Sequence, residues 1–341
     1  MKEALFYSSP AEDVVQCHLC PHSCRLRDGE GGKCRVRRNR AGMLQATSYG
    51  SITSMGMDPM EKKPLYHFYP GSEVLSVGSS GCSLTCQFCQ NWSLVHEEAP
   101  PTARLSVDQL VERCLVERER NWRCIGLAFT YSEPLVWYEY VREAAQLAKG
   151  HDLKTVLITN GYVQEAPWQE LLPWLDAVNI DVKSFSEDYY RHICRGSLAP
   201  VKEAVRTAHQ RGVHVEVTTL LVEGLNDSED EVRGLARWLS SVGQDVPLHL
   251  SRYFPAYQMD RPATSVASLE RAKRSAREYL HYVYVGNIWG WEHHSTFCPR
   301  CESLLIARKG LAVYPRQLEG RICSQCGWTL PIVGHVEETN P

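Results

Sequence analysis

The sequence predicts an α/β fold, built as a partial (β/α)6-type barrel over residues 73–290. In this region short apolar runs alternate with amphipathic segments, an alternation typical of repeated strand–helix units and a parallel sheet. The six or seven predicted units fall short of the eight that close a full barrel. The strands are expected at residues 73–77, 124–129, 154–159, 177–181, 213–221, 247–254 and 282–286.

Helix signals lie between these strands. Ser106, followed three positions on by Gln109, predicts a capping box that opens a helix running to about Arg120. Gly150 and Gly212 stand where helix C-caps are expected. Because parallel architectures place their chemistry at the carboxyl ends of strands, the residues that follow each strand are the candidates for a functional site.

The composition is that of a globular protein: 341 residues, 43% hydrophobic and 23% charged. The formal net charge of -3 supplies no broad basic field, so charge alone does not indicate a nucleic-acid partner. The local exception is the run of Arg35, Arg37, Arg38 and Arg40. Such a run is usually a solvated face and less often a contact for an anionic ligand or RNA, so nucleic acid is left open rather than expected.

The sequence predicts a cytoplasmic protein that makes no membrane contact. It has no run of 18 or more apolar residues, and its first residues open no signal peptide. In a reducing compartment, the fourteen cysteines are expected as free thiols or metal ligands rather than as disulfides. Eleven of them fall into three clusters, and the remaining Cys114, Cys124 and Cys194 are interpreted as buried small hydrophobic residues.

The central cluster is the triplet Cys82, Cys86 and Cys89, on the loop that follows the first predicted strand. Three closely spaced thiolates hold three irons of a [4Fe-4S] cluster, and the fourth iron then keeps a position open for an exogenous ligand. Clusters used only for electron transfer normally have four protein ligands, so a triplet indicates cofactor or substrate chemistry. The alternative is a zinc knuckle or a set of structural thiols, but the loop lacks the second Cys-x2-Cys pair that zinc prefers.

The Cys-x3-Cys-x-aromatic-Cys pattern, with Phe88 as its aromatic residue, resembles the signature of the radical S-adenosylmethionine (SAM) superfamily. The resemblance implies an enzyme whose open iron binds the amino and carboxylate groups of SAM. One electron from the reduced cluster would cleave SAM to methionine and a 5'-deoxyadenosyl radical, which would abstract hydrogen from an unidentified substrate. The protein itself would position the reactants and exclude water.

Other strand ends extend the resemblance. Glu133, in the turn after the second strand, matches the Glu-Pro turn that receives the SAM amino group. The Thr-Asn-Gly turn at residues 159–161 and the pair of Asp181 and Lys183 are similar to segments of the activating-enzyme branch, which includes the pyruvate formate-lyase activating enzyme. Arg252 is added because a guanidinium can clamp a carboxylate or phosphate. The side chains expected to hold SAM are Phe88, Thr130, Ser132, Glu133, Thr159, Asn160, Asp181, Lys183 and Arg252.

Each of these positions has a structural alternative. A Glu-Pro dipeptide by itself marks a helix start, and Asp181 with Lys183 could form a structural ion pair. Arg252 could instead close the barrel by pairing with a neighbouring acid. Ile158 stands where the formate-lyase activase has an acidic residue before the Thr-Asn-Gly turn, which weakens the case for the matching cation site.

The last cluster predicts a zinc ribbon in residues 291–336. Two Cys-x2-Cys knuckles stand 21 residues apart, a spacing typical of a closed tetrahedral zinc site with a structural or partner-binding role. An iron-sulfur or rubredoxin-like iron site is the competing interpretation. The expected ligands are Cys298, Cys301, Cys323 and Cys326.

The first cluster predicts a Cys-rich metal-binding extension in residues 1–48, joined to the barrel by an arm at residues 49–72. Its spacing, Cys-x2-Cys-x3-Cys-x9-Cys, is looser than that of a ribbon. Zinc is expected, and a second iron-sulfur cluster that relays an electron or docks substrate stays open, because four thiolates would saturate either metal. The ligands are Cys17, Cys20, Cys24 and Cys34.

Together the flanks and the barrel resemble the AmmeMemoRadiSam-system radical SAM family nearly end to end. The resemblance rests on the cysteine motifs, on Asp-Pro-x-Glu-Lys-Lys-Pro-Leu at residues 58–65, and on Val-Gly-Asn at residues 285–287. It implies AMMECR-like and Memo-like pathway proteins as partners, with flavodoxin or ferredoxin as the electron donor. One rival function is an activase that installs a glycyl radical on a partner protein, and another is a non-catalytic iron-sulfur or zinc scaffold.

Overall fold

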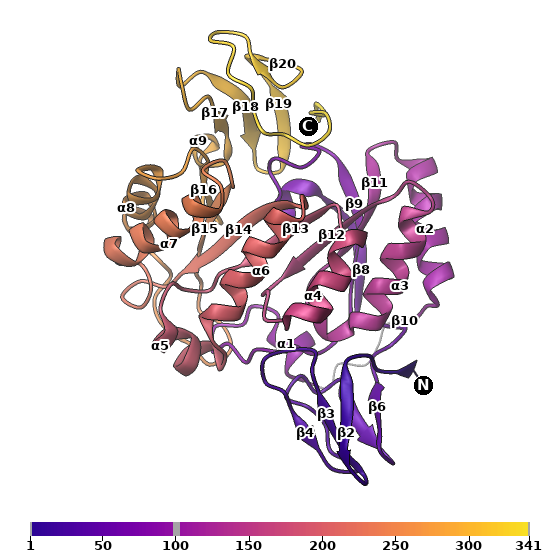
Figure 1. The fold of residues 1–341 in the computed structure, drawn as a ribbon. Helices are drawn as coiled ribbons and strands as arrows, with labels where there is room; N and C mark the ends of the chain where they lie inside the picture. Colours follow the sequence, from indigo (N-terminus) through magenta and orange to yellow (C-terminus); the bar gives the residue numbers. More distant parts are fainter. Residues whose placement is uncertain (1, 98–102, 340–341) are drawn as a thin grey trace.

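The computed structural model describes residues 2–97 and 103–339, and an eight-stranded sheet forms its centre (Figure 1). Seven strands lie side by side in chain order, each parallel to the next, and β8 is added antiparallel to β9 at one edge. The strands are β8 (Ser54–Pro59), β9 (Glu73–Gly78), β11 (Cys124–Phe129), β12 (Lys154–Thr159), β13 (Ala177–Asp181), β14 (His214–Leu221), β15 (Leu248–Arg252) and β16 (Val283–Gly286). The sheet confirms the mostly parallel α/β architecture predicted from the sequence.

Each crossover between parallel strands carries a helix, as connections of this kind require. Figure 1 shows α3, α4 and α6 packed over the same face of the sheet. The predicted capping box is present, because the Ser106 side chain accepts from the Gln109 amide and the Gln109 side chain accepts from the Ser106 amide. The crossover helices are α2 (Val107–Arg120), α3 (Tyr138–Lys149), α4 (Glu165–Leu171), α6 (Leu198–Gln210), α7 (Glu229–Val242) and α8 (Val266–Arg277).

The arm contributes β8, a strand that the sequence did not predict. Its alternation of apolar and polar residues is weak, and most of its side chains are only half-buried. Pairing with β9 over its whole length makes it a strand, with Met55 opposite Val77 and Met57 opposite Leu75. Near the end of β8, the Asp58 carboxylate holds the arm by pairing with Lys62 and Lys63 at 2.7 Å each.

Residues 2–48, here called the N-terminal module, form two small three-stranded sheets. One contains β1 (Lys2–Glu3), β5 (Arg37–Arg40) and β6 (Met43–Ala46); the other contains β2 (Tyr7–Ala11), β3 (Val14–Cys17) and β4 (Arg25–Leu26). The module is tied to the barrel by a buried ion pair between Arg37 of β5 and Glu139 of α3, each with a side chain 1% exposed. In Figure 1 it lies at the lower end of the sheet, beside α1 (Trp92–Val95).

The C-terminal segment forms a small antiparallel sheet at the opposite end of the central sheet (Figure 1). Its strands are β17 (Thr296–Phe297), β18 (Leu304–Lys309) and β19 (Ala312–Pro315), followed by the pair β20 (Leu318–Glu319) and β21 (Ile322–Cys323). Arg308, fully buried, donates to the Tyr66 carbonyl at 2.8 Å and pairs with Glu61 at 3.4 Å. The segment is therefore fixed to the arm through a buried charge pair.

The helices within residues 2–97 and 103–339 are short. The longest, α2 and α7, have 14 residues each, whereas a bilayer span needs about 20 apolar residues. None of the helices in this part of the chain has the length and apolar character required to cross a membrane.

Candidate functional site

A cavity of about 290 Å³ lies at the carboxyl ends of the parallel strands. The three central cysteines line it together with residues that follow β11, β12 and β13. All but one of the side chains predicted to hold SAM are among its lining residues. Those present are Phe88, Thr130, Ser132, Glu133, Thr159, Asn160, Asp181 and Lys183.

The cysteine loop is held in place from two sides. Gly81, just before Cys82, has φ +89°, and a Cβ there would lie 2.6 Å from the Cys34 carbonyl oxygen of the N-terminal module. On the other side, the amides of Thr85 and Gln87 donate to carbonyls of Cys194 and Ile193 at 3.0 and 3.1 Å. These acceptors belong to a π-helical turn, a feature that is frequent at functional sites.

The thiols of this loop fit an iron-sulfur cluster. The Leu84 amide and the Asn160 side-chain amide both donate to Cys82 Sγ at 3.4 Å, the kind of hydrogen bond that tunes a metal-bound thiolate. Burial raises the pKa of Cys89 to about 11, so a metal cation is needed to hold it as a thiolate. The triplet is not among the described groups whose ligand atoms all lie within 4.8 Å, which suits a cluster in which each thiolate binds its own iron.

Glu133 is the most constrained acid in the cavity. Its Oε1 accepts from the Leu135 amide at 2.9 Å and the Thr159 hydroxyl at 2.6 Å, and its Oε2 accepts from the Asn160 amide at 2.8 Å. Burial nevertheless raises the pKa of Glu133 to about 7. The carboxylate therefore gains from a further N–H donor or cation in the cavity.

Asp181 and Lys183 form an ion pair of 2.8 Å beside the cysteines. Burial works against the Lys183 ammonium, but Asp181 and the Cys86 thiol raise its pKa above the ordinary value. Lys183 therefore carries positive charge in the cavity at neutral pH. The pair is the structural ion pair that the sequence left open, and it also faces the space in which a ligand would lie.

Arg252 does not line this cavity. Its Nε donates to the Thr264 carbonyl at 2.7 Å, and its guanidinium lies 4.9 Å from the centre of the Phe254 ring. The structure thus engages Arg252 with the loop after β15 and does not bring it to the other predicted SAM contacts.

Several lining residues received no role from the sequence. Asn287 donates to the Ser251 hydroxyl at 3.0 Å, and both face the cavity. The Val-Gly-Asn motif marked Asn287, but nothing local indicated which way its side chain would point. The other lining residues without a predicted role include Gln90, Asn91, His96, Tyr131, Thr218 and Leu220.

A larger cavity, of about 810 Å³, lies at the other end of the sheet. It is lined by Lys154 and His214, the first residues of β12 and β14, and by Arg321 and Val333 of the C-terminal segment. It contains none of the cysteines, so it is separate from the candidate site.

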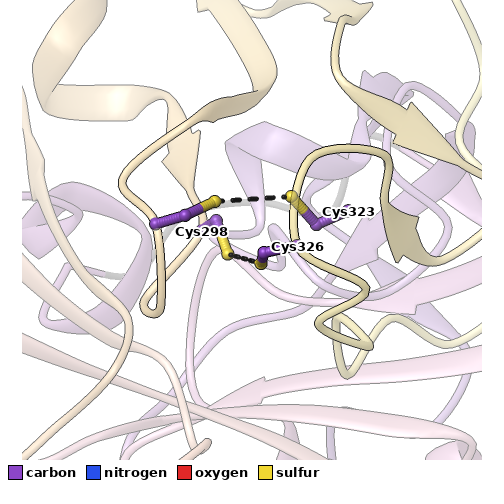
Figure 2. Close-up of side chains that lie close together, drawn as sticks. Cys298, Cys323 and Cys326 are labelled. Atoms are coloured by element: carbon purple, nitrogen blue, oxygen red, sulfur yellow. Dashed lines mark hydrogen bonds between the residues drawn. The ribbon is translucent and has the colours of Figure 1, made fainter.

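The four C-terminal cysteines are grouped closely enough to hold a single metal ion. Their sulfur atoms all lie within 4.8 Å of one another, with Cys298 and Cys326 3.5 Å apart and Cys301 and Cys323 3.7 Å apart. A tetrahedral zinc with Zn–S bonds of about 2.3 Å would separate its sulfurs by about 3.8 Å. Figure 2 shows the Cys298, Cys323 and Cys326 side chains turned toward one another. The donor set and spacing fit Zn²⁺.

The N-terminal cysteines also face one another, but less tightly. A Cβ on Gly32 would lie 3.7 Å from Cys34 Sγ and 3.8 Å from Cys24 Sγ, and Arg37 Nη1 lies 3.8 Å from Cys17 Sγ. Burial first, and then the neighbouring thiols, raise the pKa of Cys20 to about 12. Within the described residues this set does not reach the 4.8 Å spacing of the C-terminal site.

Comparison with known proteins places the cysteine loop in a known family. The model of the radical SAM superfamily matches residues 76–239, which begin in β9 and end in α7. A pyruvate formate-lyase-activating enzyme of Clostridium pasteurianum is 22% identical over 209 residues, covering 58% of this chain and 85% of that enzyme. The structure of Streptococcus suis SuiB bound to precursor peptide SuiA superposes with a TM-score of 0.51 at 13% identity, covering 67% of this chain and 51% of SuiB.

An uncharacterized protein of Methanocaldococcus jannaschii is similar over the whole chain. It is 38% identical over 338 residues, which cover 98% of this chain and all of that protein. The flanking modules are thus shared with this relative, while the barrel shares its fold and cysteine loop with enzymes of known type. The chain is an enzyme of the radical SAM superfamily.

Proposed function

We propose that this enzyme reductively cleaves SAM to methionine and a 5'-deoxyadenosyl radical, which abstracts hydrogen from a substrate that the site does not identify. The observation that carries the proposal is the meeting of three cysteine thiols with Glu133 and the Asp181–Lys183 pair in one cavity. When bound, a [4Fe-4S] cluster supplies the electron for the cleavage.

The residues divide the work of holding the two cofactors. Cys82, Cys86 and Cys89 would each bind one iron and leave the fourth open for SAM. Glu133, held by three donors, would accept from the SAM amino group. The polar side chains of Thr130, Ser132, Thr159 and Asn160 would orient SAM within the cavity, and Lys183 would offer its positive charge to the SAM carboxylate. Phe88, buried and 6.0 Å from the Tyr189 ring, would keep the loop packed.

We also propose that the enzyme belongs to the AmmeMemoRadiSam system. The motifs in both flanks support this proposal. The similarity to the uncharacterized relative extends over 98% of the chain and so includes both flanks. The proposal implies AMMECR-like and Memo-like partners, a flavodoxin or ferredoxin as donor, and a cytoplasmic location. It divides the chain at residues 1–48, 49–72, 73–290 and 291–336, with Zn²⁺ on Cys298, Cys301, Cys323 and Cys326.

A second candidate is an activase that places a glycyl radical on a partner protein. The similarity to the pyruvate formate-lyase-activating enzyme, which extends over 85% of that enzyme, favours it. The two functions differ in their product, because only the activase leaves a stable radical on a polypeptide. Membership in a superfamily of enzymes argues against the non-catalytic scaffold.

Cluster loading followed by a product assay tests the proposal. The protein is reconstituted anaerobically with iron and sulfide, reduced with dithionite in the presence of SAM, and assayed for 5'-deoxyadenosine. We expect the nucleoside from the unaltered protein and none from Cys86→Ala, which removes an iron ligand but leaves the C-terminal zinc. Cys114→Ala is the matched control, since Cys114 is also buried but does not line the cavity. Equal turnover by Cys86→Ala would refute the assignment.

A further inference from the structure

The N-terminal cysteines lie against the loop that carries the catalytic cysteines. His22 Nε2 is 2.8 Å from the Ser83 carbonyl oxygen, and Ser83 directly follows Cys82. Cys34 contributes the carbonyl that crowds Gly81, on the other side of Cys82. The C-terminal zinc-ribbon cysteines, by contrast, belong to the segment at the far end of the sheet (Figure 1).

From this placement we infer that Cys17, Cys20, Cys24 and Cys34 bind a second iron-sulfur cluster through which electrons enter the enzyme. The inference rests on the proposed function, since it supplies the electron that SAM cleavage consumes. A cluster with four thiolate ligands has no open iron, so its role is electron transfer rather than substrate chemistry.

Spacing favours a cluster over a single zinc ion. The sulfur atoms of the C-terminal set all lie within 4.8 Å of one another, close enough to share one ion. Among the described residues, the sulfur atoms of the N-terminal set do not lie this close together. Four thiolates that each bind a different iron stand farther apart than four that share one ion. The two sets have the same donor chemistry, so the difference lies in geometry.

A buried cation accompanies the N-terminal set. Arg37 is 1% exposed, and its Nη1 lies 3.8 Å from Cys17 Sγ. Glu139 and the Leu5 carbonyl accept from its two terminal nitrogens, but its Nε has no partner among the described residues. The guanidinium thus approaches a cysteine sulfur through Nη1 and keeps a buried Nε without a partner, and both features suit an anionic cluster whose sulfurs accept hydrogen bonds.

The four N-terminal cysteines differ in their exposure to solvent. Cys17 and Cys34 are buried, whereas Cys20 and Cys24 are partly exposed. Residues 17–40 contain seven Lys or Arg and two Asp or Glu, although the whole chain has a net charge of -3. The exposed cations of this segment are Arg25, Arg27, Lys33, Arg35, Arg38 and Arg40. This surface complements an acidic one-electron carrier protein.

Each step of the proposed transfer moves one electron from a donor to an acceptor. A reduced flavodoxin-class or ferredoxin-class carrier gives one electron to the N-terminal cluster and is itself oxidised. The N-terminal cluster passes that electron to the central cluster and returns to its starting state, so no bond forms or breaks. The central cluster then holds the electron that SAM cleavage requires.

Metal analysis of the full chain after anaerobic reconstitution tests the inference. We expect about eight irons and one zinc per chain, against about four irons and two zincs if the N-terminal site holds zinc. The Cys20→Ser/Cys24→Ser variant should lose about four irons and keep the zinc. Loss of zinc instead, or retention of all iron, would overturn the inference. Cys82→Ser/Cys86→Ser, which should lose the other four irons, reports separately on the proposed function.

Electron paramagnetic resonance tests the same point without a substitution. The reduced unaltered protein should show two cluster signals, of which SAM changes only one. A single signal that SAM converts completely would contradict a second cluster while supporting the proposed function.

Charge reversal tests the route of entry. Arg25→Glu/Arg27→Glu should slow reduction of the chain by flavodoxin by about tenfold at low salt, with unchanged iron content. Arg300→Glu/Arg316→Glu makes the same charge change at the far end, on residues that are also exposed. Equal slowing by both variants would show that net charge, and not the N-terminal surface, sets the rate.

Discussion

Glu133 shows how burial and hydrogen bonding oppose each other at one residue. Three donors stabilise its carboxylate, yet complete burial outweighs them and raises its pKa to about 7. Because the folded pKa is raised above that of the unfolded chain, this group favours folding at low pH, and its contribution is lost as the pH rises from about 4.5 to about 7. The site thus keeps an acid that is ready to lose its proton when a cationic or N–H-donating group arrives.

We therefore expect SAM binding to depend on pH through Glu133. If the Glu133 carboxylate accepts a hydrogen bond from SAM, its protonation should weaken SAM binding. The affinity for SAM should then fall as the pH drops below about 7, by a factor that approaches tenfold per pH unit. Anaerobic titration of the cluster-loaded protein at pH 6 to 8 measures this. Glu133→Gln, which has the same size and no titrating proton, should bind more weakly and lose this dependence. The same slope in both proteins would assign it to another group.

At the scale of elements, buried ion pairs attach both flanks to the barrel. Arg37 of β5 reaches Glu139 of α3, and Arg308 of β18 reaches Glu61 of the arm. All four side chains are nearly inaccessible to solvent, so each charge depends on its partner. If only surface contacts attached the flanks, the N-terminal and C-terminal cysteines would be free to move relative to the cavity.

Glu139→Ala should destabilise the protein by about 3 to 5 kcal/mol, because it leaves the Arg37 charge buried without its partner. Thermal or urea denaturation of the metal-free chain measures the loss. Glu203→Ala is the control, since Glu203 pairs with Arg206 on the surface at about half exposure and should cost less than about 1 kcal/mol. A small effect of Glu139→Ala would mean that water reaches Arg37.

At the scale of the whole molecule, the C-terminal cysteines are separated from the other two cysteine sets. The central cavity includes the cysteine loop, which contacts the N-terminal module through His22 and Ser83. Figure 1 shows the N-terminal module at one end of the sheet and the C-terminal segment at the other. A metal ion bound there would be remote from the cavity, and we expect it to stabilise the segment, because the segment's buried apolar cluster is small and includes its own cysteines Cys298 and Cys323.

Cys298→Ser/Cys323→Ser should remove one zinc and leave the iron content unchanged. Without the ion, β17 to β21 lose their cross-link, so limited proteolysis should cut first within this segment. Ser324→Ala changes an exposed residue in the same loop, and this variant should keep both its zinc and its resistance to proteolysis. Loss of iron from the ribbon variant would show that the ends of the molecule are coupled.

The strands show how much of the fold the local residue pattern predicts. β11, β12 and β13 begin and end at the predicted residues, because each is an apolar run bounded by turns. β8 was missed because its pattern is weak and only pairing with β9 makes it a strand. Arg252 was predicted as a SAM contact, but its guanidinium donates to the Thr264 carbonyl in the loop after β15.

The sequence by itself determined two features of the candidate site. Three cysteines within one loop must lie close together because they are near neighbours in the chain, and polar residues that follow successive parallel strands are expected at one edge of the sheet because parallel strands end there. Only the tertiary structure decided which distant segments meet. His22 touches Ser83 across 61 positions, and Arg37 reaches Glu139 across 102. Such contacts depend on how the modules pack, and no local pattern of residues encodes that packing.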